Sequence, residues 1–153
     1  MGRTYLWRGL DAPRIEIAHV DALDPFRARG TQIGVLYELR YELDGDRLSA
    51  LVVGGDSCEL ELGGTDFFDL GYSPLFNTLP VLRHGLHRGG EPRDFVMRWV
   101  PELEVSRSEQ RYEPLAPGRV RYRAGSFAAD LELDDDGFVV RYPGLAERIE
   151  NPR

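Results

Sequence analysis

Apolar and polar residues alternate with a period of two through most of this chain, and that alternation constrains its fold more than any other feature. In the run VLYELRYEL at 35–43, Val, Tyr and Leu side chains share one face and mostly charged side chains share the other. This pattern is typical of β-strands with one face buried. Similar runs predict inward faces formed by these sets: Ile15 and Ile17; Cys58, Leu60 and Leu62; Phe95, Met97 and Trp99; Val120, Tyr122 and Ala124; Phe127, Ala129, Leu131 and Leu133; Phe138, Val140 and Tyr142.

Glycine and proline separate these runs at short intervals, as turns between strands require. The last two runs flank DDDG at 134–137 and predict a hairpin in which Gly137 adopts a positive φ. No segment has an apolar helical stripe of three turns. The segment 21–29 is compatible with a short helix, which Pro25 limits to one or two turns.

Strands with one apolar face need a cover, and without helices the sheet can only cover itself. The sequence therefore predicts an all-β fold with little helix, in which a single antiparallel sheet is rolled on itself as an open barrel or spiral β-roll. A length of 153 residues favours one domain over 1–153.

Charge and composition exclude several classes of function. The formal net charge is −7, and the basic residues, all arginines, are interleaved with a larger number of carboxylates, so nucleic acid is not an expected partner. The single cysteine cannot form an intramolecular disulfide. Neither a secretory signal nor an apolar stretch of membrane-spanning length is evident, which predicts a cytoplasmic protein without a transmembrane segment.

The motifs that could carry chemistry all have simpler interpretations. His84 and His87 have the spacing of helical metal ligands, but neighbouring proline and glycines favour solvated loop histidines. DDDG lacks the later glutamate of a calcium loop. GYSPL at 71–75 lacks the second glycine of a nucleophile elbow, and Pro74 replaces the oxyanion donor. We therefore expect no metal, no cofactor and no catalysis.

The stretch GYSPLFNTLPVLRHGL at 71–86 is apolar but interrupted by two prolines. These prolines favour extended geometry at Ser73 and Leu79, so the segment is predicted to cross or cap the sheet in a non-repetitive conformation. Asn77 and Thr78 can satisfy such a backbone locally. Two interpretations remain open, a plug that fills the sheet and a lid over a ligand pocket.

The predicted inner face is rich in tyrosine, including Tyr37, Tyr41, Tyr122 and Tyr142. Rings with polar tips suit a cavity wall, because each buried hydroxyl needs a partner. Alternatively, each hydroxyl bonds a neighbouring strand and the interior is simply filled.

Three segments resemble a bacterial glycolipid-binding family first described as a domain of unknown function. They are YSPLFNTLPVLR (72–83), WVPELEVSRSEQRYEPL (99–115) and YRAGSFAADLELDDDGFVVRYPGLAERI (122–149), while the first half matches through Trp7 and its strand pattern. The resemblance implies a rolled antiparallel sheet, similar in outline to the factors that carry lipoproteins across the bacterial periplasm. Family members often read PFTNTLP where this chain reads PLFNTLP, so ligand specificity is not carried over.

The leading hypothesis is non-enzymatic binding of a lipid, glycolipid or other amphipathic ligand inside the rolled sheet. The candidate residues are Tyr72, Leu75, Phe76, Asn77, Thr78 and Leu79 at a mouth or lid, Trp99, Tyr112, Tyr122 and Tyr142 on the wall, and Arg83 for an anionic head group. The alternative is an interaction or structural module with a filled core and no small-molecule ligand. A hydrolase with scattered catalytic residues is the third possibility.

Overall fold

The computed structural model describes residues 2–32, 35–42, 50–53, 59–60, 64–100 and 106–150. Within these ranges the chain forms thirteen strands in one sheet, one α-helix, α1 (Pro74–His84), and one 3₁₀-helix, η1 (Leu86–Arg88). The strands are β1 (Arg3–Gly9), β2 (Ile15–Leu23), β3 (Phe26–Gln32), β4 (Val35–Tyr41), β5 (Ala50–Val53), β6 (Glu59–Leu60), β7 (Phe67–Leu70), β8 (Arg93–Val100), β9 (Ser106–Ala116), β10 (Arg119–Ala124), β11 (Phe127–Leu133), β12 (Val139–Tyr142) and β13 (Ala146–Arg148).

The sheet is continuous, open and strongly curved, which confirms the predicted rolled sheet. Its order is β6-β5-β4-β3-β2-β1-β13-β12-β11-β10-β9-β8-β7, so β6 and β7 are its two edges. Neighbouring strands in the described ranges are antiparallel except for β7 and β8, which are parallel. A parallel pair needs a long crossover connection, and the segment containing α1 supplies it.

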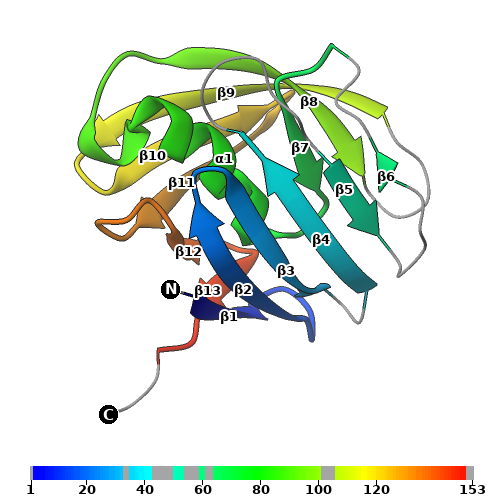
Figure 1. The fold of residues 1–153 in the computed structure, drawn as a ribbon. Helices are drawn as coiled ribbons and strands as arrows, with labels where there is room; N and C mark the ends of the chain where they lie inside the picture. The colour runs from blue at the N-terminus through cyan, green and yellow to red at the C-terminus, as the bar shows by residue number, and fades with distance from the viewer. Residues whose placement is uncertain are drawn as a thin grey trace.

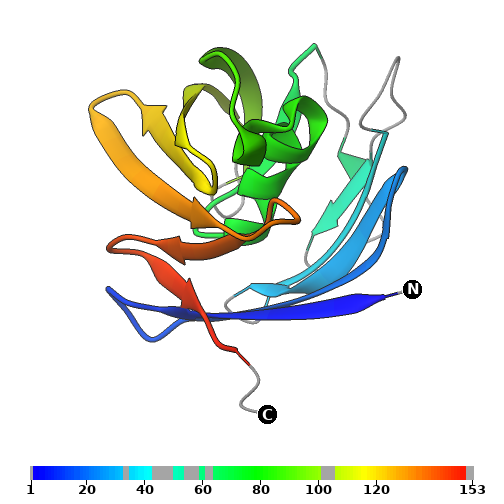
Figure 2. The same ribbon diagram turned by 90° about the vertical axis from the view of Figure 1, so that its left-hand side faces the viewer.

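The helix α1 lies inside the curve of the sheet (Figures 1 and 2). The prediction of a non-repetitive segment was therefore wrong. Ser73 is extended, as expected before a proline, but Pro74 occupies the first helical turn, where a missing N–H costs nothing. Pro80 is inside the helix and cannot donate to the carbonyl of Phe76. Every side chain from 74 to 81 is buried, and this packing outweighs the poor helix propensity.

The interior of the roll is filled by the apolar side of α1, which corrects the expectation that the sheet has only itself for cover. Leu75, Phe76 and Leu79 are almost completely buried. The Phe76 ring packs edge-on against Tyr37 of β4, with ring centroids 5.4 Å apart. Residues 74–81 of α1 therefore fill the interior of the roll, as the plug interpretation expects.

In strand β2 the buried side chains are the opposite set from the one predicted. Ile15 and Ile17 are exposed, while Glu16 is 3% exposed and shares the inner face with Ala18 and Val20. The Ser73 hydroxyl donates to Glu16, and the Leu75 amide approaches the same carboxylate at 3.4 Å. These partners at the start of α1 allow a carboxylate to occupy the core.

Other local predictions near this strand also need correction. The segment 21–29 forms no helix, because β2 and β3 run directly into each other through a turn at Asp24 and Pro25. Within β2, His19 pairs with Thr4 of β1 and Arg29 of β3. Cys58 and Leu62 lie outside the described residues.

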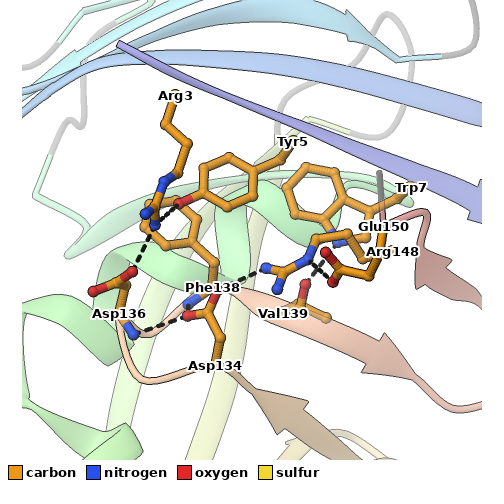
Figure 3. A network of polar contacts seen from close by, with 9 residues as sticks. All are labelled: Arg3, Tyr5, Trp7, Asp134, Asp136, Phe138, Val139, Arg148 and Glu150. Atoms are coloured by element: carbon orange, nitrogen blue, oxygen red, sulfur yellow. Dashed lines mark hydrogen bonds and ion pairs between the residues drawn. The ribbon is translucent and has the colours of Figure 1, made fainter. Parts of the chain in front are cut away.

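The turn between β11 and β12 is held by a polar network that also reaches β1 and β13 (Figure 3). One carboxylate oxygen of Asp134 accepts hydrogen bonds from the amides of Asp136 and Phe138, and the other accepts from Arg148 of β13 at 2.7 Å. Gly137 has φ 91°, which confirms the predicted hairpin. From β1, Arg3 bonds Asp136 at 2.6 Å.

Candidate ligand-binding pocket

A pocket of about 440 Å³ opens at one end of the roll. Trp99 lies near the end of β8, Tyr122 near the end of β10 and Tyr142 at the end of β12, while Phe127 begins β11. The sheet topology brings these residues to the same end of the roll, next to the start of α1. The lining residues are Asp11, Asp69, Leu70, Gly71, Tyr72, Ser73, Asn77, Trp99, Tyr122, Phe127, Tyr142, Pro143, Gly144 and Leu145.

Aromatic side chains dominate the wall and the mouth. All phenylalanines, tyrosines and tryptophans of the chain fall within the described ranges, and only Tyr72 (53%), Trp99 (38%) and Phe127 (50%) are exposed. All three line this pocket. Behind them, the Tyr122 ring lies 6.2 Å from the rings of both Phe127 and Tyr142. The exposed aromatic surface of the protein is therefore concentrated at one opening.

Polar groups lie deeper in the pocket. Asp69 of β7 is directly opposite Trp99 of β8 in the parallel pair, so both side chains are on the same face of the sheet. Gln110 donates to one Asp69 oxygen at 2.6 Å. Burial raises the pKa of Asp69 to about 6, although the hydrogen bond from Gln110 acts in the opposite direction. Asn77 donates to the buried Tyr112 hydroxyl at 2.9 Å.

The mouth is shaped by a turn with an unusual backbone. Tyr72 has φ 66°, a left-handed conformation that is uncommon outside glycine. Its carbonyl accepts a hydrogen bond from Gln32 of β3 at 3.1 Å. The Arg14 guanidinium lies 4.5 Å from the centroid of the Tyr72 ring and forms an ion pair with Asp11 at 2.6 Å. Gln32 and Arg14 therefore fix this turn and hold Tyr72 at the opening of the pocket.

The Glu16 carboxylate supports this turn from inside the core. It holds Ser73, which lines the pocket, and approaches the first amides of α1. Burial raises the pKa of Glu16 to about 7, while the hydrogen bonds from Ser73 and Leu75 act to lower it. Burial and the nearby Glu16 charge raise the pKa of Tyr37 well above its usual value. Glu16 therefore links β2 to the wall of the pocket.

The structure brings some of the candidate residues predicted from the sequence together and separates the others. Those that line the pocket are Tyr72, Asn77, Trp99, Tyr122 and Tyr142. Tyr112 lies behind the wall, with its ring 5.3 Å from Tyr122. The four that lie in the buried part of α1, away from the pocket, are Leu75, Phe76, Thr78 and Leu79.

Arg83 lies at the opposite end of the roll from the pocket. It lines a separate hollow with Asp66 and Phe95, near the starts of β7 and β8. The head-group role predicted for Arg83 does not fit this pocket, because the strand ends that form the pocket are far along the sheet from the strand starts. No arginine lines the pocket among the described residues.

Sequence reasoning missed Asp69 and Phe127 as members of this site. Asp69 was one of many carboxylates, and its signal was its position in FFDL, a run whose other side chains are all buried. Phe127 was assigned to the core by its phase, but it begins β11 and is exposed at the rim. Pro143 and Gly144 mark a turn in the sequence, but only the topology places this turn at the pocket.

The two histidines of HGLH differ from the loop residues predicted. His84 ends α1 and its ring lies 5.4 Å from Phe95, while His87 is in η1 and buried. Burial lowers the pKa of both imidazoles. In the part of the chain that is described, no three His, Cys, Asp or Glu side chains gather as metal ligands would.

Comparisons with known proteins agree with this architecture. A family model described as "Putative glycolipid-binding" matches residues 38–148. A crystal structure of a DUF1089 family protein from Pseudomonas aeruginosa has a similar fold, with 23% identity and a TM-score of 0.58 over 97% of this chain and 91% of that chain. No curated protein matches the chain. Within the described residues, no helix has the length and apolar character needed to span a bilayer, and a cytoplasmic location stays a prediction.

Proposed function

We propose that this chain, which belongs to the glycolipid-binding family identified above, binds a lipid, glycolipid or similar amphipathic molecule in the pocket at the end of the roll. The proposal is one of binding without catalysis. It differs from binding inside the sheet, because α1 occupies that interior. The ligand would instead lie between the first turns of α1 and the ends of β8, β10 and β12.

One observation carries the proposal: every exposed aromatic side chain of the protein lines the same pocket. Exposure of aromatic side chains to water is unfavourable, and a ligand that covers them removes this cost. A volume of about 440 Å³ is within the usual range for small-molecule sites. The wall also offers carboxylate and amide groups, Asp69 and Asn77, to the hydroxyl groups of a sugar.

Burial of an alkyl chain can supply the affinity. Each methylene removed from water contributes about 0.8 kcal/mol. Several methylenes against Trp99 and Phe127 would therefore offset a good part of the cost of association, which is several kcal/mol. A ligand with both an alkyl chain and a sugar would use the apolar rim and the polar wall together.

The experiment that tests this function is titration with decyl maltoside below its micellar concentration, followed by native mass spectrometry and calorimetry. We expect a 1:1 complex. The double substitution Trp99→Ala with Phe127→Ala should weaken binding about tenfold or more, because it removes most of the rim's ring surface.

The matched control carries Ile17→Ala with Leu36→Ala, which removes exposed apolar side chains from the outer face of the sheet. It should bind decyl maltoside as the unmodified protein does. Thermal unfolding of both double variants verifies that they fold. Equal affinity of the two variants, or no complex with any alkyl glycoside, would reject the proposal.

The alternative of an interaction module has an observation of its own. The exposed side chains of Ile17 and Leu36 lie in one stripe across the outer face of β1–β4, which also contains the half-buried side chains of Leu6 and Thr31. Such a stripe is a common feature of protein-binding surfaces. The same titration separates the two functions, since a module with a filled core forms no complex with the alkyl glycoside.

A further inference from the structure

Asp69 differs from the other carboxylates that the structure describes near the pocket, because no cation is paired with it. Asp11, the other carboxylate that lines the pocket, is paired with Arg14 at 2.6 Å. Asp69 receives one hydrogen bond, from the neutral amide of Gln110, and no arginine in the described ranges is within ion-pair distance of it. A partly buried carboxylate without a counter-ion is costly, so its presence in a pocket points to a ligand that supplies the missing charge.

The rings around Asp69 are arranged to receive a cation. Trp99 is its direct neighbour in the sheet. Tyr122 and Tyr142 line the same pocket as Asp69, and the pKa values of both hydroxyls are raised, first by burial and then by the negative charge of Asp69. Aromatic faces attract ammonium groups, and a cluster of rings is a common site for methylated ammonium head groups.

The other residues around the pocket also favour a positively charged ligand. No arginine or histidine lines it in the described part of the chain, and the chain has no lysine. The nearest basic side chain at the mouth, Arg14, is engaged with Asp11 and the Tyr72 ring. An anionic head group would meet Asp69 without any compensating charge.

We propose that the pocket selects amphiphiles whose head group carries a positively charged nitrogen, with Asp69 as counter-ion and the Trp99 and Tyr122 rings against the cation. This rests on the proposed function, because it names the ligand class of the same site. The Phe127 side of the rim takes the alkyl chain, and Asp69, with the neighbouring Trp99 ring, takes the head group.

The test compares three probes that share one alkyl chain: decyltrimethylammonium, decyl maltoside and decyl sulfate, each below its micellar concentration at pH 8. The expected order of affinity is cation, then neutral sugar, then anion, with about a tenfold preference for the cation over the sugar. Asp69→Asn should abolish this preference by weakening decyltrimethylammonium binding about tenfold, with a smaller effect on decyl maltoside, because the asparagine side chain can still hydrogen-bond to sugar hydroxyl groups. Asparagine can still accept the hydrogen bond from Gln110, so the variant is expected to fold.

Nonspecific attraction to an acidic protein is controlled by Asp94→Asn, which changes the net charge equally at an exposed site in β8. This variant should keep the preference. Acidification should reduce binding of the cation as pH falls through about 6, the pKa of Asp69, in the unmodified protein but not in Asp69→Asn, which retains Glu16 with its pKa of about 7; Tyr122 and Tyr142 stay protonated throughout.

The outcomes separate the two proposals. Equal or tighter binding of decyl maltoside than of decyltrimethylammonium, or an unchanged preference in Asp69→Asn, overturns the cation proposal and leaves the proposed function standing. Failure of all three probes to bind overturns both.

Discussion

Glu16 shows how a single side chain can make the stability of this fold depend on pH. It is buried against Ser73 and the start of α1, and its pKa is raised from 4.5 to about 7. A carboxyl group whose pKa is higher in the folded state binds its proton more tightly when folded. Its contribution to stability is therefore fully present below about pH 4.5 and is lost as pH rises through about 7.

We predict that Glu16→Gln makes the protein less sensitive to pH between 5 and 8. Each pKa unit corresponds to about 1.4 kcal/mol, so we expect Glu16 to lower the unfolding free energy by about 2–3 kcal/mol across this interval. Urea unfolding at pH 5, 6, 7 and 8 measures the slope for both proteins. Parallel slopes would show that Glu16 is not the group responsible.

The sequence placed Glu16 outside the core for a physical reason. Alternation identifies two faces of a strand, but it selects the buried face only by comparing the apolar content of each. In β2 both faces carry apolar residues, and Ile15 and Ile17 make one face more apolar than Ala18 and Val20 make the other. The partners that stabilise the buried carboxylate come from 73–75, far along the chain, and local pattern cannot reveal them.

Some helices and strands follow from the local sequence, whereas others depend on contacts with distant parts of the chain. The strands β4, β8, β10 and β11 follow the predicted alternation closely, and the β11–β12 turn follows from DDDG. The helix α1 was missed because Pro80 and Thr78 are poor helix formers. Tertiary burial decides its conformation.

We predict that Phe76→Ala destabilises the protein by about 3–5 kcal/mol, because α1 is part of the core. A residue of a mobile lid would instead affect binding with little effect on stability. Chemical denaturation measures the change, and Leu36→Ala on the outer face serves as the control, with an expected cost below about 1 kcal/mol. Similar unfolding midpoints for the two variants would contradict the assignment of α1 as a plug.

Taken as a whole, the molecule could be predicted in outline but not in detail. The rolled open sheet followed from strands that lack another cover, and the family resemblance agreed with it. Five of the pocket residues were candidates from the sequence, but their assembly into one pocket could not be predicted, since it combines side chains from the β1–β2 loop, β7 and the turn after it, α1, β8, β10, β11, β12 and the β12–β13 turn. Only the strand order and the curvature around α1 bring these segments to one end (Figure 2).

The chain has two tryptophans, and their positions allow a direct measurement at the pocket. Trp7 is 1% exposed and donates its indole N–H to the Val139 carbonyl, whereas Trp99 is 38% exposed at the rim. Acrylamide quenching of tryptophan fluorescence therefore reports mainly on Trp99. Trp99→Phe retains a ring at the rim and leaves only the shielded Trp7 as a signal.

Saturation with decyl maltoside should shift the emission to shorter wavelength and protect it from acrylamide in the unmodified protein. Trp99→Phe should still form the 1:1 complex by native mass spectrometry but show no change in emission. Binding that leaves Trp99 as accessible to acrylamide as before would contradict a ligand site at this end of the roll.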